Sequence, residues 1–257
     1  MIDILRHLLA LCRFFFFLIA TLILGIAQLL WRAASKEAYV IPQLFQRLIC
    51  WILNIKVVVR GEISKSKPLL LMANHLSWAD IMVIGSTTPC RFVAKQEVAS
   101  WPFFNIFAYL QNTVFIERSR KGTMEGTNKL AETIKQDPRI YILFPEGSNS
   151  FIKGKFLPFK SSYFSVAENN PTIAVQPVAL NIIAVEGNTV LSQQDYEYYA
   201  WGDVGFFKHL WRFFGRWSYQ IDVNFLAVLE TDNKDRKALA LETEAVINQQ
   251  IHSHQQN

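Results

Sequence analysis

Apolar residues form one long run near the start of the chain. Residues 14–31 read FFFFLIATLILGIAQLLW, about 18 positions without a charged side chain. As a helix this run would extend about 27 Å, against about 30 Å for the hydrocarbon core of a bilayer. Gln28, Trp31 and Arg32 stand where signal-peptide cleavage would need small residues. The run therefore predicts a membrane helix that is retained in the protein.

A second apolar pattern, at residues 44–54, has the period of a helix. One face of this helix would carry Leu44, Phe45, Leu48, Ile49 and Ile52. Basic residues flank the first apolar run on both sides, so the positive-inside bias does not set its orientation. We therefore expect residues 1–55 to be N-terminal membrane-attachment helices: either a helical hairpin in one leaflet, or a single span followed by an interfacial helix.

After residue 54, short β-branched or apolar runs alternate with helical patterns. The expected strands are 56–60, 68–73, 91–94, 113–116, 140–144, 173–180 and 220–229. The expected helices are 77–86, 122–136, 161–169 and 235–251. This alternation predicts an α/β domain over residues 56–257, a sheet flanked by helices. The full chain is then an α/β fold preceded by an N-terminal membrane helix or helical hairpin.

Composition narrows the class of protein. Apolar residues make up 51% of the 257 positions and charged residues 18%, which excludes intrinsic disorder and favours membrane contact. The net charge of +5 fits either a nucleic acid or an anionic lipid surface, and the hydrophobicity favours the lipid, so we expect no nucleic-acid partner. Cys12, Cys50 and Cys90 lie far apart with no CxxC pair, which argues against a disulfide framework and a zinc site. We expect a cytosol-facing protein without a bound metal.

A histidine and an aspartate follow the second expected strand, within the sequence NHLSWAD at 74–80. Ser77 is expected to cap the next helix, which would bring Asp80 within reach of the His75 imidazole. A carboxylate on one ring nitrogen fixes the tautomer and leaves the other nitrogen to take a proton from a hydroxyl. The alternative is a loop histidine beside an aspartate that the helix dipole favours. The spacing alone leaves both interpretations open.

A second polar cluster, FPEGSNS at 144–150, follows the fifth expected strand. Gly147 would let a ligand approach the backbone, and Ser148 offers a hydrogen-bond donor. No GxSxG elbow occurs, so we expect no nucleophile from the protein itself. Lys95 and Arg118 each come directly after an apolar strand, and together they predict an anion site. The lysines at 153 and 155 are better explained as surface charges that keep the protein soluble.

In order and spacing, four blocks resemble the glycerolipid acyltransferase family typified by 1-acylglycerol-3-phosphate O-acyltransferase. The first is the pair His75 and Asp80, with four residues between them. The others are FIER at 115–118, FPEGSNS at 144–150 with LPFK at 157–160, and VQPV at 175–178. The resemblance covers roughly residues 56–180, and it makes 56–257 an acyltransferase domain with a motif-bearing core at 68–180.

The resemblance implies the transfer of a fatty acyl group from acyl-CoA or acyl-acyl carrier protein to the free hydroxyl of a lysolipid, with no bound cofactor. His75 would deprotonate the hydroxyl, and Asp80 would orient His75. Lys95 matches a family lysine used for the acceptor's phosphate. The acceptor site would be shaped by Arg118, Glu146, Gly147 and Ser148. The resemblance further implies a membrane-associated enzyme of phospholipid biosynthesis on the cytoplasmic face, at the inner membrane in a bacterium.

Two positions depart from the family pattern. Asn149 stands where the family has an arginine that contacts phosphate, and Asn112 replaces a glycine before the second block. Lysophosphatidic acid is the first expectation for the acceptor, with phosphatidic acid as product. A lyso-ornithine lipid O-acyltransferase is the alternative, because the turn at 146–148 and the stretch YAWGD at 199–203 resemble that branch. The loss of arginine also leaves a catalytically silent lipid-binding relative open.

The segment FFKHLWRFFGRW at 206–217 mixes large aromatic residues with cations. Such a mixture suits the headgroup boundary of a membrane, where tryptophan tips and arginine side chains are both satisfied. The alternative is a buried aromatic helix with an exposed basic edge.

Overall fold

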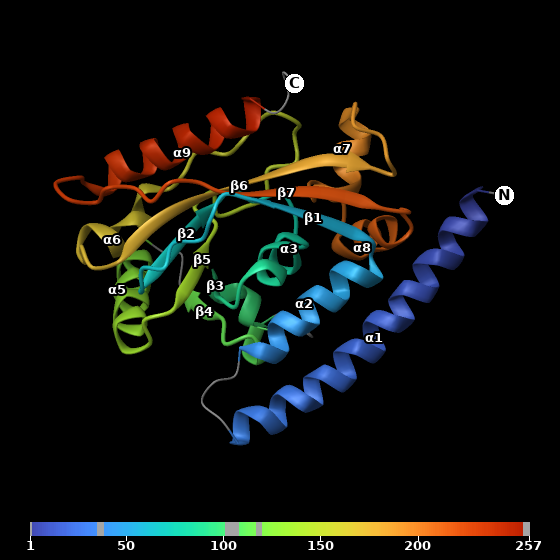
Figure 1. The fold of residues 1–257 in the computed structure, drawn as a ribbon, viewed down its shortest axis with the longest axis horizontal. Coiled ribbons are helices and arrows are strands. Elements are labelled where there is room, and N and C mark those ends of the chain that lie inside the picture. Colours follow the sequence, from blue (N-terminus) through green and yellow to red (C-terminus); the bar gives the residue numbers. More distant parts are fainter. Residues whose placement is uncertain (1, 35–38, 101–107, 117–119, 254–257) are drawn as a thin grey trace.

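The computed structural model describes residues 2–34, 39–100, 108–116 and 120–253. Its centre is a sheet in the order β1-β7-β6-β2-β5-β3-β4 (Figure 1). The strands β2, β3, β4, β5 and β6 run parallel, β7 is antiparallel to β6, and β1 is parallel to β7. Their bounds are β1 Ile55–Arg60, β2 Leu69–Ala73, β3 Arg91–Lys95, β4 Val114–Ile116, β5 Ile140–Leu143, β6 Ala174–Val185 and β7 Tyr219–Phe225.

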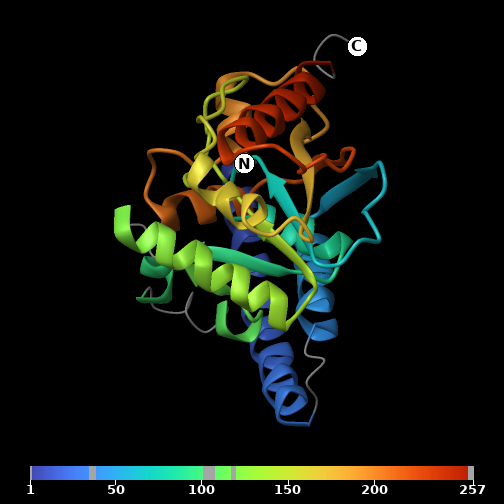
Figure 2. The same cartoon turned by 90° about the vertical axis from the view of Figure 1, so that its left-hand side faces the viewer.

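Helices cover both faces of this sheet (Figures 1 and 2). The helices are α1 Ile2–Ala34, α2 Val40–Ile52, α3 Asp80–Thr87, α5 Arg120–Gln136, α6 Ser165–Glu168, α7 Gln193–Tyr199, α8 Phe206–Phe214 and α9 Arg236–Ser253, with 3₁₀ turns at Gln96–Ser100 and Ser161–Phe164. The α/β class predicted from the alternating patterns is confirmed, as is the N-terminal apolar helix. The proposed division at residue 55 stays a prediction.

The central strand β2 shows how the two faces are built. Leu69, Leu71 and Ala73 belong to the core that includes side chains of α2, α3, α7 and α8. Leu70 and Met72 belong to the core on the other face, with α5, α6 and α9. All five residues of β2 are therefore buried, as expected for a parallel strand with both faces covered. Because β2 is covered on both faces, its sequence is a continuous apolar run and lacks the alternation of a half-exposed strand.

The long helix α1 lies on the outside of α2 and α8 (Figure 1). Its buried residues are two alanines, Ala10 and Ala20, and two polar residues, Arg13 and Gln28. Its leucine, isoleucine and phenylalanine side chains point mostly outward; Leu22 is 65% exposed and Leu30 68%. A helix that packs on protein along one side and faces lipid along the other has this arrangement, with small and polar residues inward and large apolar residues outward.

Arg13 fastens α1 to the end of α8. Its guanidinium donates hydrogen bonds to the backbone oxygens of Phe214 and Trp217, at 3.1 Å each, and to that of Arg216. These carbonyls lie in the last turn of α8 and just after it, where the helix has no backbone donors left to offer. One cation thus satisfies several acceptors and the negative end of the helix dipole.

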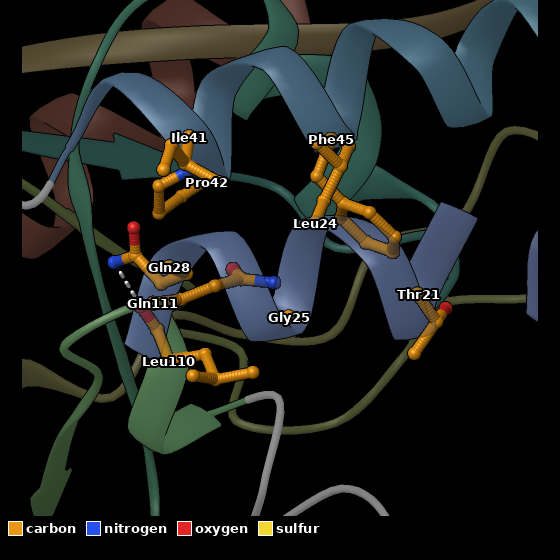
Figure 3. Close-up of a pocket in the computed structure, with 9 residues that line it drawn as sticks. All are labelled: Thr21, Leu24, Gly25, Gln28, Ile41, Pro42, Phe45, Leu110 and Gln111. Carbon is orange, nitrogen blue, oxygen red and sulfur yellow. Dashed lines mark hydrogen bonds between the residues drawn. The ribbon is translucent and has the colours of Figure 1, made fainter. Parts of the chain in front are cut away.

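A small cavity of about 30 Å³ separates α1 from α2 (Figure 3). It is lined by residues of both helices and by Leu110 and Gln111, and it has room for one or two water molecules. At its edge the Gln28 side chain donates to the Leu110 carbonyl at 2.8 Å. No residue of the β2 or β5 loops lines this cavity, so it is separate from the polar clusters that follow those strands.

Two expected strands end four or five residues away from the expected position, and one helix was not expected. The strand expected at 173–180 continues to Val185, because β6 extends past the end of β2 and pairs there with β7 alone. The strand expected at 220–229 ends at Phe225, and only Leu229 bridges back to Val175. Sequence reasoning did not find α7, and the aromatic segment after residue 206 forms α8.

Candidate active site

The polar clusters predicted from the sequence lie at one edge of the sheet. The strands β2, β5, β3 and β4 are neighbours and parallel, so their carboxyl ends share that edge. His75 follows β2, Glu146 to Ser148 follow β5, and Lys95 ends β3. Arg118 follows β4 but lies outside the described residues. Open parallel sheets place their ligand sites at this edge.

Asp80 is the centre of the hydrogen bonds at this edge. Its Oδ2 lies 2.8 Å from His75 Nδ1 and accepts the backbone N–H groups of Leu76, at 2.6 Å, and Ser77, at 2.9 Å. Its Oδ1 accepts the Tyr199 hydroxyl at 3.0 Å. The carboxylate is completely buried, and these donors replace the water it has lost. A carboxylate facing Nδ1 places the imidazole proton there and leaves Nε2 as the basic nitrogen.

The start of α3 differs from the expectation for Ser77. The helix begins at Asp80 with Ala79 as its N-cap, and no side chain caps it in the usual way. The Ser77 hydroxyl is buried and has no hydrogen-bond partner in the described part of the chain. The Asp80 carboxylate instead accepts the N–H groups of Leu76 and Ser77, in the loop ahead of the helix. The aspartate therefore shapes the loop that carries His75 as well as facing the imidazole.

His75 is held from the other side by the loop after β5. Its ring stacks on Phe144 with centroids 4.0 Å apart, and its side chain is 17% exposed. Its backbone N–H donates to Glu146 Oε1 at 2.7 Å, and its carbonyl accepts the Ser150 N–H at 2.7 Å. No described residue bonds to Nε2. The imidazole is thus fixed in orientation and open at the nitrogen that would take a proton.

The Glu146 carboxylate is occupied by the chain's own donors. Besides His75 N–H it accepts the Ser150 hydroxyl and the Leu157 N–H, the latter at 3.1 Å. Burial raises the pKa of Glu146, and its hydrogen bonds act in the opposite direction. This carboxylate joins the two loops of the site. Of the two residues after it, Gly147 is buried with a left-handed φ of +69°, and Ser148 is exposed.

The two departures from the family pattern have distinct surroundings. Asn112 has φ +55°, a left-handed conformation that glycine and asparagine adopt most readily, which accounts for the exchange at this position. The side-chain nitrogen of Asn149 is buried and has no hydrogen-bond partner among the described residues. The Lys153 ammonium donates to the Leu191 carbonyl at 2.5 Å, so it has a structural partner away from the site.

Two residues that sequence reasoning did not assign belong to this constellation. Asn74 bonds both the N–H and the carbonyl of Leu180, at 2.7 and 3.0 Å, and so extends the pairing of β2 with β6. Tyr199, at the end of α7, reaches Asp80 from 119 residues away. The stretch YAWGD at 199–203 was noted in the sequence, but no spacing rule connects a residue there to the loop after β2.

Known proteins match this chain over most of its length. The Acyltransferase family model matches residues 54–181. A lyso-ornithine lipid O-acyltransferase of Rhizobium meliloti is 36% identical over 219 residues, covering 82% of this chain and 73% of its own. The chain belongs to the Acyltransferase family. The acyltransferase activity predicted from the four blocks is therefore confirmed.

Other relatives of this acyltransferase have two kinds of name. A lyso-ornithine lipid O-acyltransferase of Brucella abortus is 34% identical, covering 78% of this chain and 77% of its own. A 1-acyl-sn-glycerol-3-phosphate acyltransferase of Neisseria gonorrhoeae is 32% identical, covering 66% and 64%. The crystal structure of the LPA acyltransferase PlsC from Thermotoga maritima matches with a TM-score of 0.73 at 22% identity, over 100% of this chain and 99% of that one. That likeness shows the fold.

Proposed function

We propose that this acyltransferase moves a fatty acyl group from a thioester to the hydroxyl of a lysolipid, with His75 as the general base. The observation that carries the proposal is the buried Asp80 carboxylate on Nδ1 of an imidazole whose Nε2 is open. Such a pair serves to remove a proton from a hydroxyl and to hold the charge that results. The sequence offers no GxSxG serine, which favours direct attack by the acceptor.

The reaction balances with these groups alone. Nε2 of His75 takes the hydroxyl proton as the acceptor oxygen attacks the carbonyl carbon of the thioester. The C–S bond breaks, and the imidazolium returns the proton to the departing thiolate. Asp80 stabilises the imidazolium in between, and its hydrogen bonds to the loop keep the ring from turning away.

For the acceptor we favour a lyso-ornithine lipid. The Rhizobium and Brucella relatives with this name match over a larger share of the chain than the Neisseria relative does. Asn149 offers an unpartnered amide where the family has an arginine. A phosphomonoester carries nearly two negative charges and gains most from a bidentate cation, whereas the carboxylate and ammonium of an ornithine headgroup nearly cancel. An amide donor suits the second better.

Lysophosphatidic acid is the second candidate. Lys95 supports it, because this cation ends β3 at the edge of the sheet where His75 lies. The Neisseria relative also bears this specificity in its name. The acyl donor in either case is a thioester of coenzyme A or of acyl carrier protein.

The outer face of α1 supports membrane association. Within the described residues, α1 is the one helix long and apolar enough to cross a membrane. At 33 residues it would extend about 50 Å, longer than the hydrocarbon core is thick, so it would have to tilt or lie partly in the interface. We place the catalytic domain on the cytoplasmic face, because both donor thioesters are soluble there.

The test is acyl transfer by the full chain reconstituted in lipid, with acyl-CoA and acyl-acyl carrier protein offered separately. Lyso-ornithine lipid and lysophosphatidic acid are supplied in parallel. His75→Ala should lower turnover by at least about a thousandfold. The matched control is His252→Ala, because His252 is an exposed residue of α9 far along the chain from the site. Near wild-type turnover by His75→Ala would show that His75 is not the general base.

Restoring the family arginine tests the acceptor. Asn149→Arg should raise kcat/KM for lysophosphatidic acid relative to lyso-ornithine lipid by about tenfold, since one charge-assisted contact is worth about 1.5–3 kcal/mol. An unchanged ratio would show that position 149 does not choose the headgroup.

A further inference from the structure

The loop that carries His75 has a second support, formed by α7, α8 and the chain between them. The N–H of Trp201 donates to the Leu76 carbonyl at 2.9 Å. The indole N–H of Trp78 donates to Nδ1 of His209, which is completely buried, at 3.2 Å. Both contacts reach the loop from residues beyond 181, where the family match ends. This support therefore lies outside the part of the chain that the motifs describe.

Tyr199 makes the contact in this support that is nearest the reacting atoms. Its hydroxyl donates to Oδ1 of Asp80 at 3.0 Å, and both residues are completely buried. Oδ2 takes the other donors of the carboxylate, His75 among them. Among the described residues, Tyr199 is thus the single hydrogen-bond donor on Oδ1. Donors on both oxygens fix the plane of a carboxylate, whereas donors on one oxygen leave it free to tilt.

The tyrosine itself is firmly held. Its ring packs against Phe213 of α8 and Tyr219 of β7, with centroids 5.5 and 5.7 Å away. The helix that ends at Tyr199 begins with a reciprocal capping box between Ser192 and Asp195. Burial, followed by the charge of Asp80, raises the pKa of Tyr199 well above its ordinary value. The hydroxyl is therefore a neutral donor throughout the pH range in which a histidine titrates.

We propose that Tyr199 is a positioning residue for acyl transfer: its hydroxyl fixes the plane of the Asp80 carboxylate and takes up part of its charge, which holds His75 in place and tunes its basicity. This inference rests on the proposed function, since it concerns the same base. The chemistry predicts two separable effects of removing the hydroxyl. A less fixed carboxylate orients the imidazole less well, and a carboxylate with more free charge stabilises the imidazolium more.

The test variant is Tyr199→Phe, which keeps the ring and removes the donor. We expect kcat to fall about tenfold with KM for donor and acceptor unchanged, because the hydroxyl contacts neither substrate. The acid limb of the kcat/KM profile should move to higher pH by about half a unit, since more charge on Asp80 favours protonated His75. A residue with a structural role alone would lower activity without moving the limb.

The matched control is Tyr219→Phe. Tyr219 is equally buried, lies beside Tyr199, and donates to the backbone carbonyls of Phe213 and Tyr198 at 3.1 and 3.2 Å. Its loss removes a buried hydroxyl from the same cluster but leaves Asp80 untouched. We expect this variant to lose a similar amount of stability while it keeps the wild-type acid limb.

The other titratable groups around Tyr199 and Asp80 do not account for a shift of the acid limb between these variants. They are Cys50 of α2, Tyr196 of α7, Tyr219 of β7 and Glu146 after β5. Burial raises the pKa of Cys50 to about 12, and it raises those of Tyr196 and Tyr219 above their ordinary values. Glu146 is present in all the variants, so the difference between them isolates the hydroxyl.

A second readout does not depend on turnover. The His75 resonance of ¹³C-histidine-labelled full-length protein in detergent, assigned with His75→Ala, is titrated by NMR. Tyr199→Phe should move its midpoint upward by about half a unit, and Tyr219→Phe should leave it in place. Equal behaviour of the two variants in both measurements would overturn the proposal. Wild-type protein that acylates neither lysolipid would refute the proposed acceptors, and the NMR titration would still decide the role of Tyr199.

Discussion

Helix α1 is largely apolar and strand β2 is entirely so, yet their surroundings are opposite. Every residue of β2 is buried, because α3 and its neighbours cover one face of the sheet and α5, α6 and α9 the other. In α1 most of the large apolar side chains face outward, and the buried positions hold alanine, arginine and glutamine. The comparison teaches that the position of the polar residues, more than the amount of hydrophobicity, tells a lipid-facing helix from a core strand.

The largest expected difference comes from matched leucines. Leu71→Ala, in β2, should lower the free energy of unfolding in detergent by about 3 kcal/mol, because it opens a cavity in a closed core. Leu22→Ala, in α1, should change it by less than about 0.5 kcal/mol, since the side chain is 65% exposed. Denaturant unfolding of the two variants measures both values. Equal losses would mean that α1 is packed against protein at Leu22.

The buried His209 predicts that pH changes the free energy of unfolding by an amount similar to that of Leu71→Ala. Burial lowers the pKa of His209, on α8, from 6.5 to about 4. The unfolded chain then takes up a proton below pH 6.5 that the folded chain refuses until about pH 4. Stability should therefore fall by about 3 kcal/mol as the pH drops from 7 to 4.

Unfolding of wild-type protein and His209→Phe across that range is the measurement. The variant should lose this part of the pH dependence, and His252→Phe, on the exposed side of α9, should keep it. A pH slope that is identical in wild-type protein and His209→Phe would show that His209 is not the group responsible.

A smaller effect is expected where α1 is fastened to the domain. Arg13→Gln should lower the free energy of unfolding by about 2 kcal/mol, because the carbonyls of Phe214 and Trp217 lose a charged hydrogen-bond donor in a largely buried position. Hydrogen exchange of the α8 amides should rise in the same variant. Arg47→Gln is the control, since Arg47 is exposed and bonds the Ser86 carbonyl at the surface. Similar losses from both variants would remove the special role of Arg13.

The smallest effect concerns the ion pair between Arg6 and Glu186, at 2.7 Å near the start of α1. Arg6→Gln should lower stability by about 0.5 kcal/mol at low salt and by less at high salt, because the pair is partly exposed. Unfolding at two ionic strengths measures this. A loss that does not change with salt would point to packing of the arginine stem rather than to its charge.

The sequence predicted correctly those features that depend on neighbouring residues in the chain. The apolar runs of β2 and β5 predicted that His75 and Glu146 each follow a strand, and the parallel pairing of these strands brings the two residues to one sheet edge. The prediction that Ser77 caps the helix was wrong, because α3 begins at Asp80 with Ala79 as its N-cap. Sequence reasoning also missed α7, whose short run of tyrosines and glutamines has no clear helical period.

By itself the sequence determined the α/β class, the apolar N-terminal helix and the acyltransferase motifs, since periodicity and motif spacing act over a few turns of chain. Tertiary structure alone decided that two alanines, Arg13 and Gln28 are the buried residues of α1. It also decided that a tyrosine 119 residues away completes the hydrogen bonds of Asp80. Both depend on contacts between segments distant in sequence, and such contacts arise when burial brings those segments together rather than from any pattern within one of them.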